Sequence, residues 1–311
     1  MAKSKRILIV PLDWGLGHAA RCIPIIREQL GKGHEVVLAS NGRSKALLQQ
    51  YFPQLHFLPD PPDYAVRYNS SGSFWWKMIL QIPHLLKTIR REHEWLKQLQ
   101  ERYRFDEVIS DNRYGLYLPN VRSVIITHQT APIVPGIVSG FVHRKISSWL
   151  ERFEECWIPD YKDEATSLGG KLSHTNVPSN ARYIGPLSRF RGMDVTKDET
   201  YTQVAIVSGP EPSRSIFLEK MKAQFHASSQ PSLIVCGSPE LSYDKSEGSI
   251  RLVSHLDDRQ LASYLKGAKE VHSRSGYSSL MDYHVLGITT AILTATPGQT
   301  EQEYLAKRDR G

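Results

Sequence analysis

The chain has 311 residues, 40% hydrophobic and 23% charged, which is enough apolar material for two globular domains, each with its own core. Its formal net charge of +7 favours anionic partners, which include nucleic acid, an acidic membrane surface and phosphate-bearing small molecules. Cys22, Cys156 and Cys236 lie far apart and form no CxxC pair. Neither a disulfide framework nor a zinc site is indicated, and a reducing compartment is expected.

The amino-terminal stretch, residues 1–14, is basic, but its apolar run is short and leads into a glycine turn. We therefore expect no signal peptide. No stretch approaches the roughly 20 consecutive apolar residues of a membrane-spanning helix. The cysteine usage favours a cytoplasmic protein.

The first half of the chain alternates apolar strands with helices. Residues 6–10 (RILIV) are typical of a buried strand, residues 17–30 of a helix, and residues 35–40 (EVVLAS) of a second strand. This order is the signature of a parallel sheet. Three apolar runs with polar ends continue the pattern: residues 107–111, 123–129 and 155–160. Ligands of open α/β sheets gather at the carboxyl ends of such strands.

A second series of strands and helices begins near residue 201. The preceding residues 181–200 carry Gly, Pro and charge with little periodicity and are expected to be a linker. We therefore predict an α/β protein with two Rossmann-like, doubly wound parallel-sheet domains, residues 1–180 and 201–311, that face each other across a cleft. Residues 59–73 are expected to form a long irregular loop.

The turn after the first strand, GLGHAAR, has two interpretations. Gly15, Gly17 and Ala20 satisfy the GxGxxG/A spacing of a dinucleotide-binding turn. However, the second strand ends in LASNGRS, without the acid that a nicotinamide ribose requires, and His18 and Arg21 crowd the helix start. An oxidoreductase is therefore disfavoured. His18 is either a helix-start histidine that bonds a turn carbonyl, or a neutral base for an incoming hydroxyl.

The second domain contains a turn that suits a phosphate. Residues 273–287 (SRSGYSSLMDYHVLG) combine a strand end, a Ser/Gly turn and a helix, so backbone amides and the helix dipole are available to an anion. Asp282 lies two turns into this helix, where it is either a ribose ligand or a solvated helical acid.

Taken in order, GLGH, SRSG with its following acid, and EQ resemble the motifs of GT-B glycosyltransferases, in particular the family 28, MurG-like UDP-N-acetylglucosamine transferases. The resemblance implies that the first domain binds the acceptor and the second binds the nucleotide-sugar. GLGH corresponds to the family's GGH turn, which makes His18 the expected catalytic base. Gly15, Gly17 and Arg21 lie beside it on the acceptor side.

Further acceptor-side candidates come from two other strand ends. SDNRYG and THQ follow predicted strands at the edge that carries His18, and they contribute Asp111, His128 and Gln129. Polar residues at strand ends are also commonly caps, so this alternative stays open.

The same resemblance implies a diphosphate turn in the second domain. SRSG corresponds to the family's SRAG turn at four residues, Ser273, Arg274, Ser275 and Gly276. Asp282 takes the place of the family's ribose-binding Glu. In the family this turn holds the diphosphate of the donor.

Other donor-binding roles follow from the resemblance. TEQE corresponds to the paired polar motif that contacts the donor sugar, which implicates Glu301 and Gln302. VSGPEPSR takes the place of the family's GGSxGA loop, although it contains two prolines, and implicates Ser208, Gly209 and Arg214 near the phosphates. HLDDRQLASYL resembles the segment before the base-binding loop, with the backbone around Leu256 a candidate for uracil; a capped amphipathic helix is the alternative.

The resemblance implies inverting transfer from a UDP-sugar to a hydroxyl of a saccharide or lipid-linked acceptor. His18 would take the proton, and the helix dipole, the amides and Arg274 would offset the charge of the leaving diphosphate. The chain has no DxD motif and no HxxxH spacing, so no metal or other cofactor is expected. The donor sugar stays open, with UDP-N-acetylglucosamine as the family's example. Relatives continue into another helix that crosses back, so the carboxyl end is expected to be shortened.

Residues 67–104 form a basic, aromatic segment that includes SGSFWWKMI. Its cations and tryptophans are typical of an interfacial anchor on an anionic membrane, such as the inner face of the cytoplasmic membrane, and a lipid-linked acceptor of the cell envelope would explain it. The alternative is a core-facing helix, because Leu85, Ile89, Leu96 and Leu99 form one stripe. Pro83 is expected to break the front of this segment.

Three other functions remain as alternatives. A non-hydrolysing UDP-sugar epimerase shares the two-domain architecture but needs further acid/base residues around the sugar. A catalytically silent nucleotide-sugar-binding protein is the second. Nucleic-acid binding is disfavoured, because the sequence has no basic recognition helix and no RNP-like pattern.

Overall fold

The computed structural model describes residues 3–64, 74–134 and 136–308, without the side chains of residues 74–81 and 137. The chain forms two compact units. The second unit consists of Trp14–Arg21 and the chain from Leu187 onward, and the first contains the rest. The division at Pro186 falls within the expected linker of residues 181–200. Residues 65–73, most of the expected irregular loop, lie outside the described residues.

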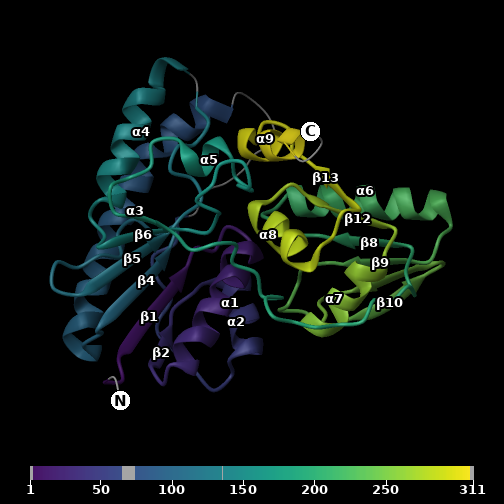
Figure 1. The fold of residues 1–311 in the computed structure, drawn as a ribbon, viewed down its shortest axis with the longest axis horizontal. Coiled ribbons are helices and arrows are strands. Elements are labelled where there is room, and N and C mark those ends of the chain that lie inside the picture. The colour runs from purple at the N-terminus through teal and green to yellow at the C-terminus, as the bar shows by residue number, and fades with distance from the viewer. Residues whose placement is uncertain (1–2, 65–73, 135, 309–311) are drawn as a thin grey trace. The chain divides into compact units, whose positions relative to one another are not determined.

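The first unit is built on seven parallel strands in the order β3-β2-β1-β4-β5-β6-β7 (Figure 1). The strands are β1 (Arg6–Pro11), β2 (Glu35–Leu38), β3 (His56–Phe57), β4 (Glu107–Asp111), β5 (Arg122–Ile126), β6 (Glu155–Ile158) and β7 (Ala181–Tyr183). The helices in this part of the chain are α1 (Leu16–Gly31), α2 (Gly42–Tyr51), α3 (Phe74–Tyr103), α4 (Gly136–Leu150) and α5 (Lys171–His174). The strand order reverses between β1 and β4, which makes their carboxyl ends the expected ligand position.

The central strands are apolar because both faces of the sheet are covered. Residues 7–10 of β1 are fully buried. Leu8 and Val10 pack in one cluster with Leu96 of α3, and Leu99 lies against the same cluster. The apolar stripe of α3 therefore packs in the core.

Two sequence predictions for the first unit are wrong in detail. Pro83 lies inside α3 and does not break it; because Pro83 is exposed, water can hydrate the carbonyl that loses its helical partner. Residues 181–183, expected in the linker, form edge strand β7, which pairs in parallel with β6. An edge strand covers less core than a central one, so it lacks the apolar run that marks the others.

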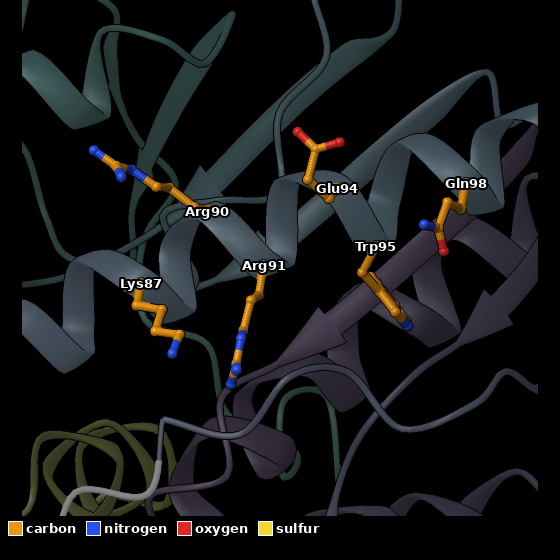
Figure 2. Close-up of a pocket in the computed structure, with 6 residues that line it drawn as sticks. All are labelled: Lys87, Arg90, Arg91, Glu94, Trp95 and Gln98. Atoms are coloured by element: carbon orange, nitrogen blue, oxygen red, sulfur yellow. The ribbon is translucent and has the colours of Figure 1, made fainter.

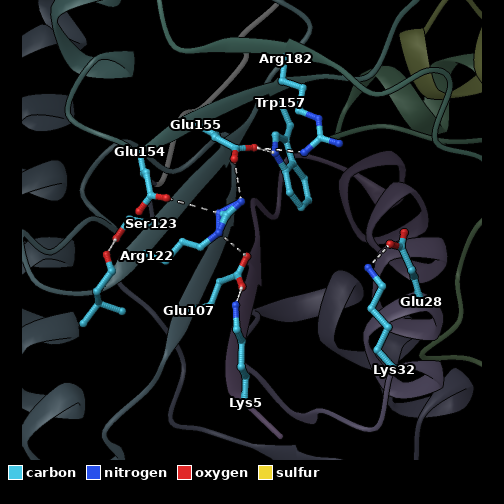
Figure 3. Close-up of polar contacts among 11 residues, drawn as sticks. Lys5, Glu28, Lys32, Glu107, Arg122, Ser123, Glu154, Glu155, Trp157 and Arg182 are labelled. Carbon is cyan, nitrogen blue, oxygen red and sulfur yellow. Dashed lines mark hydrogen bonds and ion pairs between the residues drawn. The ribbon is translucent and has the colours of Figure 1, made fainter. Parts of the chain in front are cut away.

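Charged side chains close the amino edge of the first sheet (Figure 3). Arg122, at the start of β5, lies 3.6 Å from Glu107 of β4 and 2.9 Å from Glu155 of β6. Lys5 contacts Glu107 from the other side at 3.4 Å. These pairs join neighbouring strands where they enter the sheet, so this edge is structural.

The second unit has six strands in the order β10-β11-β9-β8-β12-β13, parallel except for the β10–β11 pair. The strands are β8 (Gln203–Ile206), β9 (Ser232–Val235), β10 (Asp244–Glu247), β11 (Ile250–Val253), β12 (Glu270–Arg274) and β13 (Ala291–Thr294). The helices are α6 (Ser213–Ser228), α7 (Asp258–Gly267), α8 (Tyr277–Leu286) and α9 (Thr300–Arg308). The strand order reverses between β8 and β12, so their carboxyl ends mark the expected ligand position here.

Helices cover both faces of the second sheet. Phe217 and Phe225 of α6 pack on one face with Ile234 of β9. Leu265 of α7 and Leu286 of α8 belong to a separate cluster. The prediction of two doubly wound, parallel-sheet α/β domains is therefore confirmed.

Candidate active site

The glycine turn after β1 packs closely within the second unit, to which Trp14–Arg21 belongs. Gly15 has a φ of +132°, and a Cβ there would lie 3.3 Å from the Cα of Gly209. A Cβ on Gly17 would lie 2.7 Å from Ser278 Oγ. Gly15 is therefore favoured by its positive φ and by its approach to the loop after β8, and Gly17 by its approach to the first turn of α8.

His18 lies in the first turn of α1 with Arg21 three residues further on. Arg21 Nη2 lies 3.0 Å from His18 Nδ1. Arg21 is buried, whereas His18 is half-buried. Because a guanidinium has only N–H donors, Nδ1 of His18 is the acceptor in this hydrogen bond.

Arg274 forms hydrogen bonds with several loops at the carboxyl edge of the second sheet. Arg274 is 3% exposed. Its guanidinium donates from Nε to Thr296 Oγ1 at 2.9 Å, from Nη1 to the carbonyl of Ser208 at 3.2 Å, and from Nη2 to Gln299 Oε1 at 3.1 Å. A Cβ on Gly209 would overlap Nη1. Arg274 thus joins the loops that follow β8, β12 and β13.

The other residues of the SRSG and TEQE motifs extend this network. Ser275 Oγ donates to the carbonyl of Gln302 at 2.8 Å, and Gln302 Oε1 accepts from the amide of Thr296 at 3.0 Å. Ser273 is fully buried, and Glu301 is half-buried in the first turn of α9. The structure therefore brings the two predicted motifs together, although Gln302 uses its side chain to hold its own loop.

Arg214, in the first turn of α6, also holds the loop after β8 through hydrogen bonds. Its Nη1 donates to the carbonyl of Cys236 and to Ser238 Oγ, both at 3.0 Å. Its Nε donates to Glu211 Oε1 at 2.7 Å. Arg214 thus links the loops after β8 and β9, and its charge is paired with Glu211.

The amino end of α8 faces this set of loops. Gly276 is its N-cap residue in an extended conformation, and among the described residues no side chain caps this end. The first backbone N–H groups of a helix have no partner within the helix and carry the positive end of its dipole. Such an end, next to a Gly/Ser turn, suits an anionic oxygen.

Asp282 lies on α8 and is held by the segment that opens the second unit. Its Oδ1 accepts a hydrogen bond from Ser188 Oγ at 2.6 Å. Burial raises the pKa of Asp282 to about 6, against the opposing effect of the Arg189 charge and the Ser188 hydrogen bond. Asp282 is therefore not a solvated helical acid, and Ser188 and Arg189 are neighbours that the sequence analysis missed.

Leu256 precedes α7 and is buried in the core of the second unit. Asp257 caps α7 by accepting from the amide of Gln260 at 3.0 Å, so the alternative of a capped helix holds here. Burial and then Arg189 lower the pKa of the neighbouring His255 to about 4. His255 is therefore a neutral imidazole at physiological pH.

The acceptor-side candidates of the first unit lie at the ends of adjacent strands. Asp111 ends β4 and is fully buried, with Cys22 Sγ donating to its Oδ2 at 3.8 Å. His128 is buried and Gln129 half-buried just after β5, which pairs in parallel with β4. The amide of Gln129 donates to Thr127 Oγ1 at 3.1 Å. These three residues share the carboxyl edge of the first sheet.

A buried ion pair that the sequence analysis missed holds this edge together. Arg113 and Glu92, both at most 1% exposed, lie 2.8 Å apart. Arg113 also donates to the carbonyl of Pro11 at 3.0 Å and to Asn41 Oδ1 at 3.0 Å. Burial raises the pKa of Glu92, while Arg113 and a hydrogen bond from Tyr64 at 2.6 Å oppose the rise. The pair ties α3 to the carboxyl ends of β1, β2 and β4.

An open hollow of about 360 Å³ lies along α3 (Figure 2). Six residues line it: Lys87, Arg90, Arg91, Glu94, Trp95 and Gln98. Lys97 engages Glu94 at 3.1 Å. In the described part of the chain Lys87, Arg90 and Arg91 have no acidic partner. Of the expected membrane segment, residues 67–73 and the side chains of residues 74–81 lie outside the description.

No group of three or more His, Cys, Asp and Glu side chains in residues 3–64, 74–134 and 136–308 could hold a metal ion. No helix in the same part of the chain has the length and hydropathy required to cross a membrane.

Two parallel-sheet α/β units with loop sites at their carboxyl edges are the architecture of the GT-B glycosyltransferases, and comparison with solved structures supports this fold. Over 98% of this chain and 85% of the other, the structure resembles the glycosyltransferase SnogD from Streptomyces nogalater, with a TM-score of 0.63 and 14% identity. It also resembles the spinosyn rhamnosyltransferase SpnG complexed with thymidine diphosphate, over 98% and 83% of the two chains, with a TM-score of 0.59 and 15% identity.

A third solved structure and two sequence relatives are also similar to this chain. Arabidopsis thaliana UGT89C1, complexed with UDP-L-rhamnose, has a TM-score of 0.57 and 11% identity over 99% of this chain and 91% of that one. Proteins from Methanosarcina acetivorans and Methanosarcina mazei, each named an uncharacterized glycosyltransferase, are 23% identical over 96% of this chain and 81% of theirs. No family model matches the chain, so membership of family 28 stays a prediction.

We expect Glu92→Gln to destabilise the protein by about 3 kcal/mol, because it leaves the buried Arg113 charge without its partner. Urea denaturation measures the change. Glu94→Gln is the matched control, since it removes an exposed pair with Lys97 on the same helix and should cost less than about 1 kcal/mol. Equal unfolding midpoints for the two variants would contradict the role of the buried pair.

Asp282→Asn tests the raised pKa of this carboxyl. Because the folded pKa of about 6 exceeds the unfolded value of about 3.9, the stabilisation is complete below about pH 4 and is lost as pH rises through about 6. We expect Asp282→Asn and wild type to match near pH 4, and the variant to be more stable by about 2 kcal/mol near pH 7. Urea denaturation at both values measures this difference. The exposed Asp194→Asn is the control, and a pH-independent difference for Asp282→Asn would refute the assignment.

Proposed function

We propose that this protein is an inverting, metal-independent glycosyltransferase that transfers a sugar from a UDP-sugar to a hydroxyl of a saccharide or lipid-linked acceptor. The observation that carries the proposal is the loop network of Arg274 beside the uncapped amino end of α8. Its position outside the carboxyl ends of β8 and β12 is the usual ligand position in an open α/β sheet. The names of the sequence relatives and structural neighbours support the class of reaction.

The ligands of two neighbours support a nucleoside diphosphate sugar as the donor. SpnG was crystallised with thymidine diphosphate and UGT89C1 with UDP-L-rhamnose. Among nucleotides we favour UDP, with UDP-N-acetylglucosamine as the first sugar to test, because of the resemblance to the family 28 enzymes. In this proposal Asp282 faces the ribose, the backbone around Leu256 faces the uracil, and Glu301 and Gln302 face the sugar.

The transfer needs one nucleophile, one proton acceptor and a site for the leaving charge. The acceptor oxygen forms a bond to the anomeric carbon as the bond from that carbon to the diphosphate oxygen breaks, and its electron pair leaves with UDP. The acceptor proton passes to His18. Attack on the face opposite the leaving group inverts the anomeric centre. The leaving diphosphate lies at the amino end of α8, where helix amides and dipole stabilise its charge.

The network gives the arginines a positioning role in this reaction. Arg274 donates hydrogen bonds to Ser208, Thr296 and Gln299. Arg214 donates hydrogen bonds to Cys236 and Glu211. Both therefore fix the loops around the diphosphate. Preorganised dipoles stabilise charge without reorganisation at the moment of reaction, so fixing these loops serves the leaving group.

A donor screen tests the proposal. UDP release is measured for a panel of UDP-sugars with and without saccharide and lipid-linked acceptors, using wild type, His18→Ala and, as control, the exposed His226→Ala. We expect acceptor-dependent release from wild type and His226→Ala, and a loss of about 10²- to 10⁴-fold in His18→Ala.

Each alternative gives a different result in that screen. Interconversion of UDP-sugars without an acceptor identifies an epimerase. Thermal stabilisation by UDP without turnover identifies a binding protein. Failure of wild type to bind any nucleotide-sugar rejects the proposed function, and full activity of His18→Ala rejects only its role as base.

We propose in addition that the first unit contacts an anionic membrane on the cytoplasmic side. On α3, Lys87, Arg90 and Arg91 lie within three or four positions of one another, and such like charges repel unless an anion offsets them. On α4, Val138 is 39% and Phe141 74% exposed. Exposed apolar side chains and cations in the same unit fit the acyl and headgroup layers of a bilayer.

Neutralising Lys87, Arg90 and Arg91 with Gln should weaken binding to phosphatidylglycerol-containing vesicles by about 100-fold, because each cation near an anionic surface contributes about 1 kcal/mol. Vesicle co-sedimentation at low salt measures binding. The control neutralises three exposed cations of the second unit, Lys220, Arg259 and Lys269. If both triple variants lose the same amount of vesicle binding, the effect comes from net charge and the proposed membrane contact of α3 is rejected.

A further inference from the structure

The orientation of the candidate base is set by a hydrogen bond within the first turns of α1. Arg21 Nη2 lies 3.0 Å from His18 Nδ1. Residues three apart on a helix share one face, so the sequence spacing itself brings these side chains together.

The chemistry of the two groups fixes the proton on the imidazole. A guanidinium carries N–H donors and no acceptor, and it stays protonated in proteins. Nδ1 must therefore contribute its lone pair. In a neutral imidazole one nitrogen accepts and the other carries the proton, so the proton of His18 is on Nε2.

We propose that Arg21 is a latch on His18: it holds the imidazole in the Nε2–H tautomer, and base catalysis at Nε2 requires the Arg21–His18 hydrogen bond to break first. This inference rests on the proposed function only for its kinetic consequence. The tautomer is a property of the resting protein. Arg21 is thus a positioning residue that acts through His18.

The latch explains how a base can be present without reacting prematurely. While Arg21 donates to Nδ1, Nε2 offers a proton and cannot take one from a hydroxyl. When the bond breaks, the proton can move to Nδ1, and the lone pair on Nε2 becomes available to the acceptor. A charged donor biases the tautomer equilibrium by about tenfold or more, so the resting protein holds little of the reactive form.

Nitrogen NMR of isotopically labelled protein tests the latch without substrate. At a pH well above the ordinary histidine pKa of about 6.5, we expect Nδ1 of His18 to give an acceptor-type shift and Nε2 a protonated-type shift. His34 and His93 are internal references. His34 Nδ1 accepts from the amide of Lys5 at 3.3 Å, and His93 Nδ1 lies 3.3 Å from the carbonyl of Gly115 and must donate.

Variants at Arg21 separate the latch from a merely structural role. The ammonium of Arg21→Lys can donate a hydrogen bond but cannot accept one, so this variant should keep His18 in the Nε2–H tautomer. Arg21→Met removes the donor and should give a mixture of the two His18 tautomers. A protonated Nδ1 in wild type overturns the proposal, as does an Arg21→Met spectrum with the wild-type ratio. The wild-type spectrum alone decides if Arg21→Met does not fold.

Kinetics then test the consequence for transfer. We expect kcat of Arg21→Met to exceed that of Arg21→Lys by up to about tenfold, the bias that the charged donor imposes. A lower kcat in Arg21→Met overturns the latch. Absence of any transfer by wild type rejects the proposed function and leaves the tautomer result standing, so the two failures are distinguishable.

Discussion

The loops at the carboxyl edges of the two sheets depend on buried guanidinium groups. A loop beyond the end of a parallel strand has lost the ladder hydrogen bonds, and its carbonyls still need donors. In the first unit Arg113 donates to the carbonyls of Pro11 and Pro62 and to the side-chain oxygen of Asn41. In the second unit Arg274 donates to the carbonyl of Ser208 and to the side-chain oxygen of Thr296 in the loop after β13. A planar group with five N–H donors is the side chain best able to join several loops at once.

The ion pairs at the two edges of the first sheet differ in burial. At the amino edge, Arg122 contacts Glu107 and Glu155 on neighbouring strands, and side chains that are partly exposed close the sheet. At the carboxyl edge, Arg113 and Glu92 are buried together. Burying a pair is costly unless its remaining donors and acceptors are satisfied, and the backbone of the loops satisfies them. The buried pair therefore fixes the edge that carries Asp111 and His128.

The sequence predicts the central strands well and the edges poorly. Central strands of a parallel sheet are covered on both faces, so residues 7–10 of β1 and residues 204–206 of β8 are apolar. β10 (DKSE) is polar and pairs with β11 at one edge of the sheet. β7 lies within a stretch that has the composition of a linker. Neither has the apolar pattern on which the prediction depends. At Pro83 the sequence predicts a helix break that the structure does not have. A proline is tolerated there because the position is exposed, whereas in a buried helical turn it would leave a carbonyl without a donor.

The sequence also predicts which motifs belong to the candidate site, but not what their side chains contact. SRSG and TEQE do meet, through Ser275 and Gln302. Yet Arg274 finds Ser208 from 66 positions away, and Ser188 reaches Asp282 from 94 positions away. No local pattern can anticipate such partners. The His18–Arg21 contact differs because its spacing is local, and helix geometry alone could have indicated it.

The distribution of these contacts changes what the net charge of +7 implies. Basic residues of the donor loops were expected to serve the phosphates, but Arg214 is paired with Glu211 and Arg274 donates to loop oxygens. The cations without an acidic partner in the described chain include Lys87, Arg90 and Arg91 on α3. The Glu211 carboxylate offsets the charge of Arg214, whereas the neutral oxygens bound by Arg274 leave its charge in place. The excess charge is therefore divided between the exposed surface of α3, where the proposed membrane contact would lie, and the buried Arg274 of the proposed donor site.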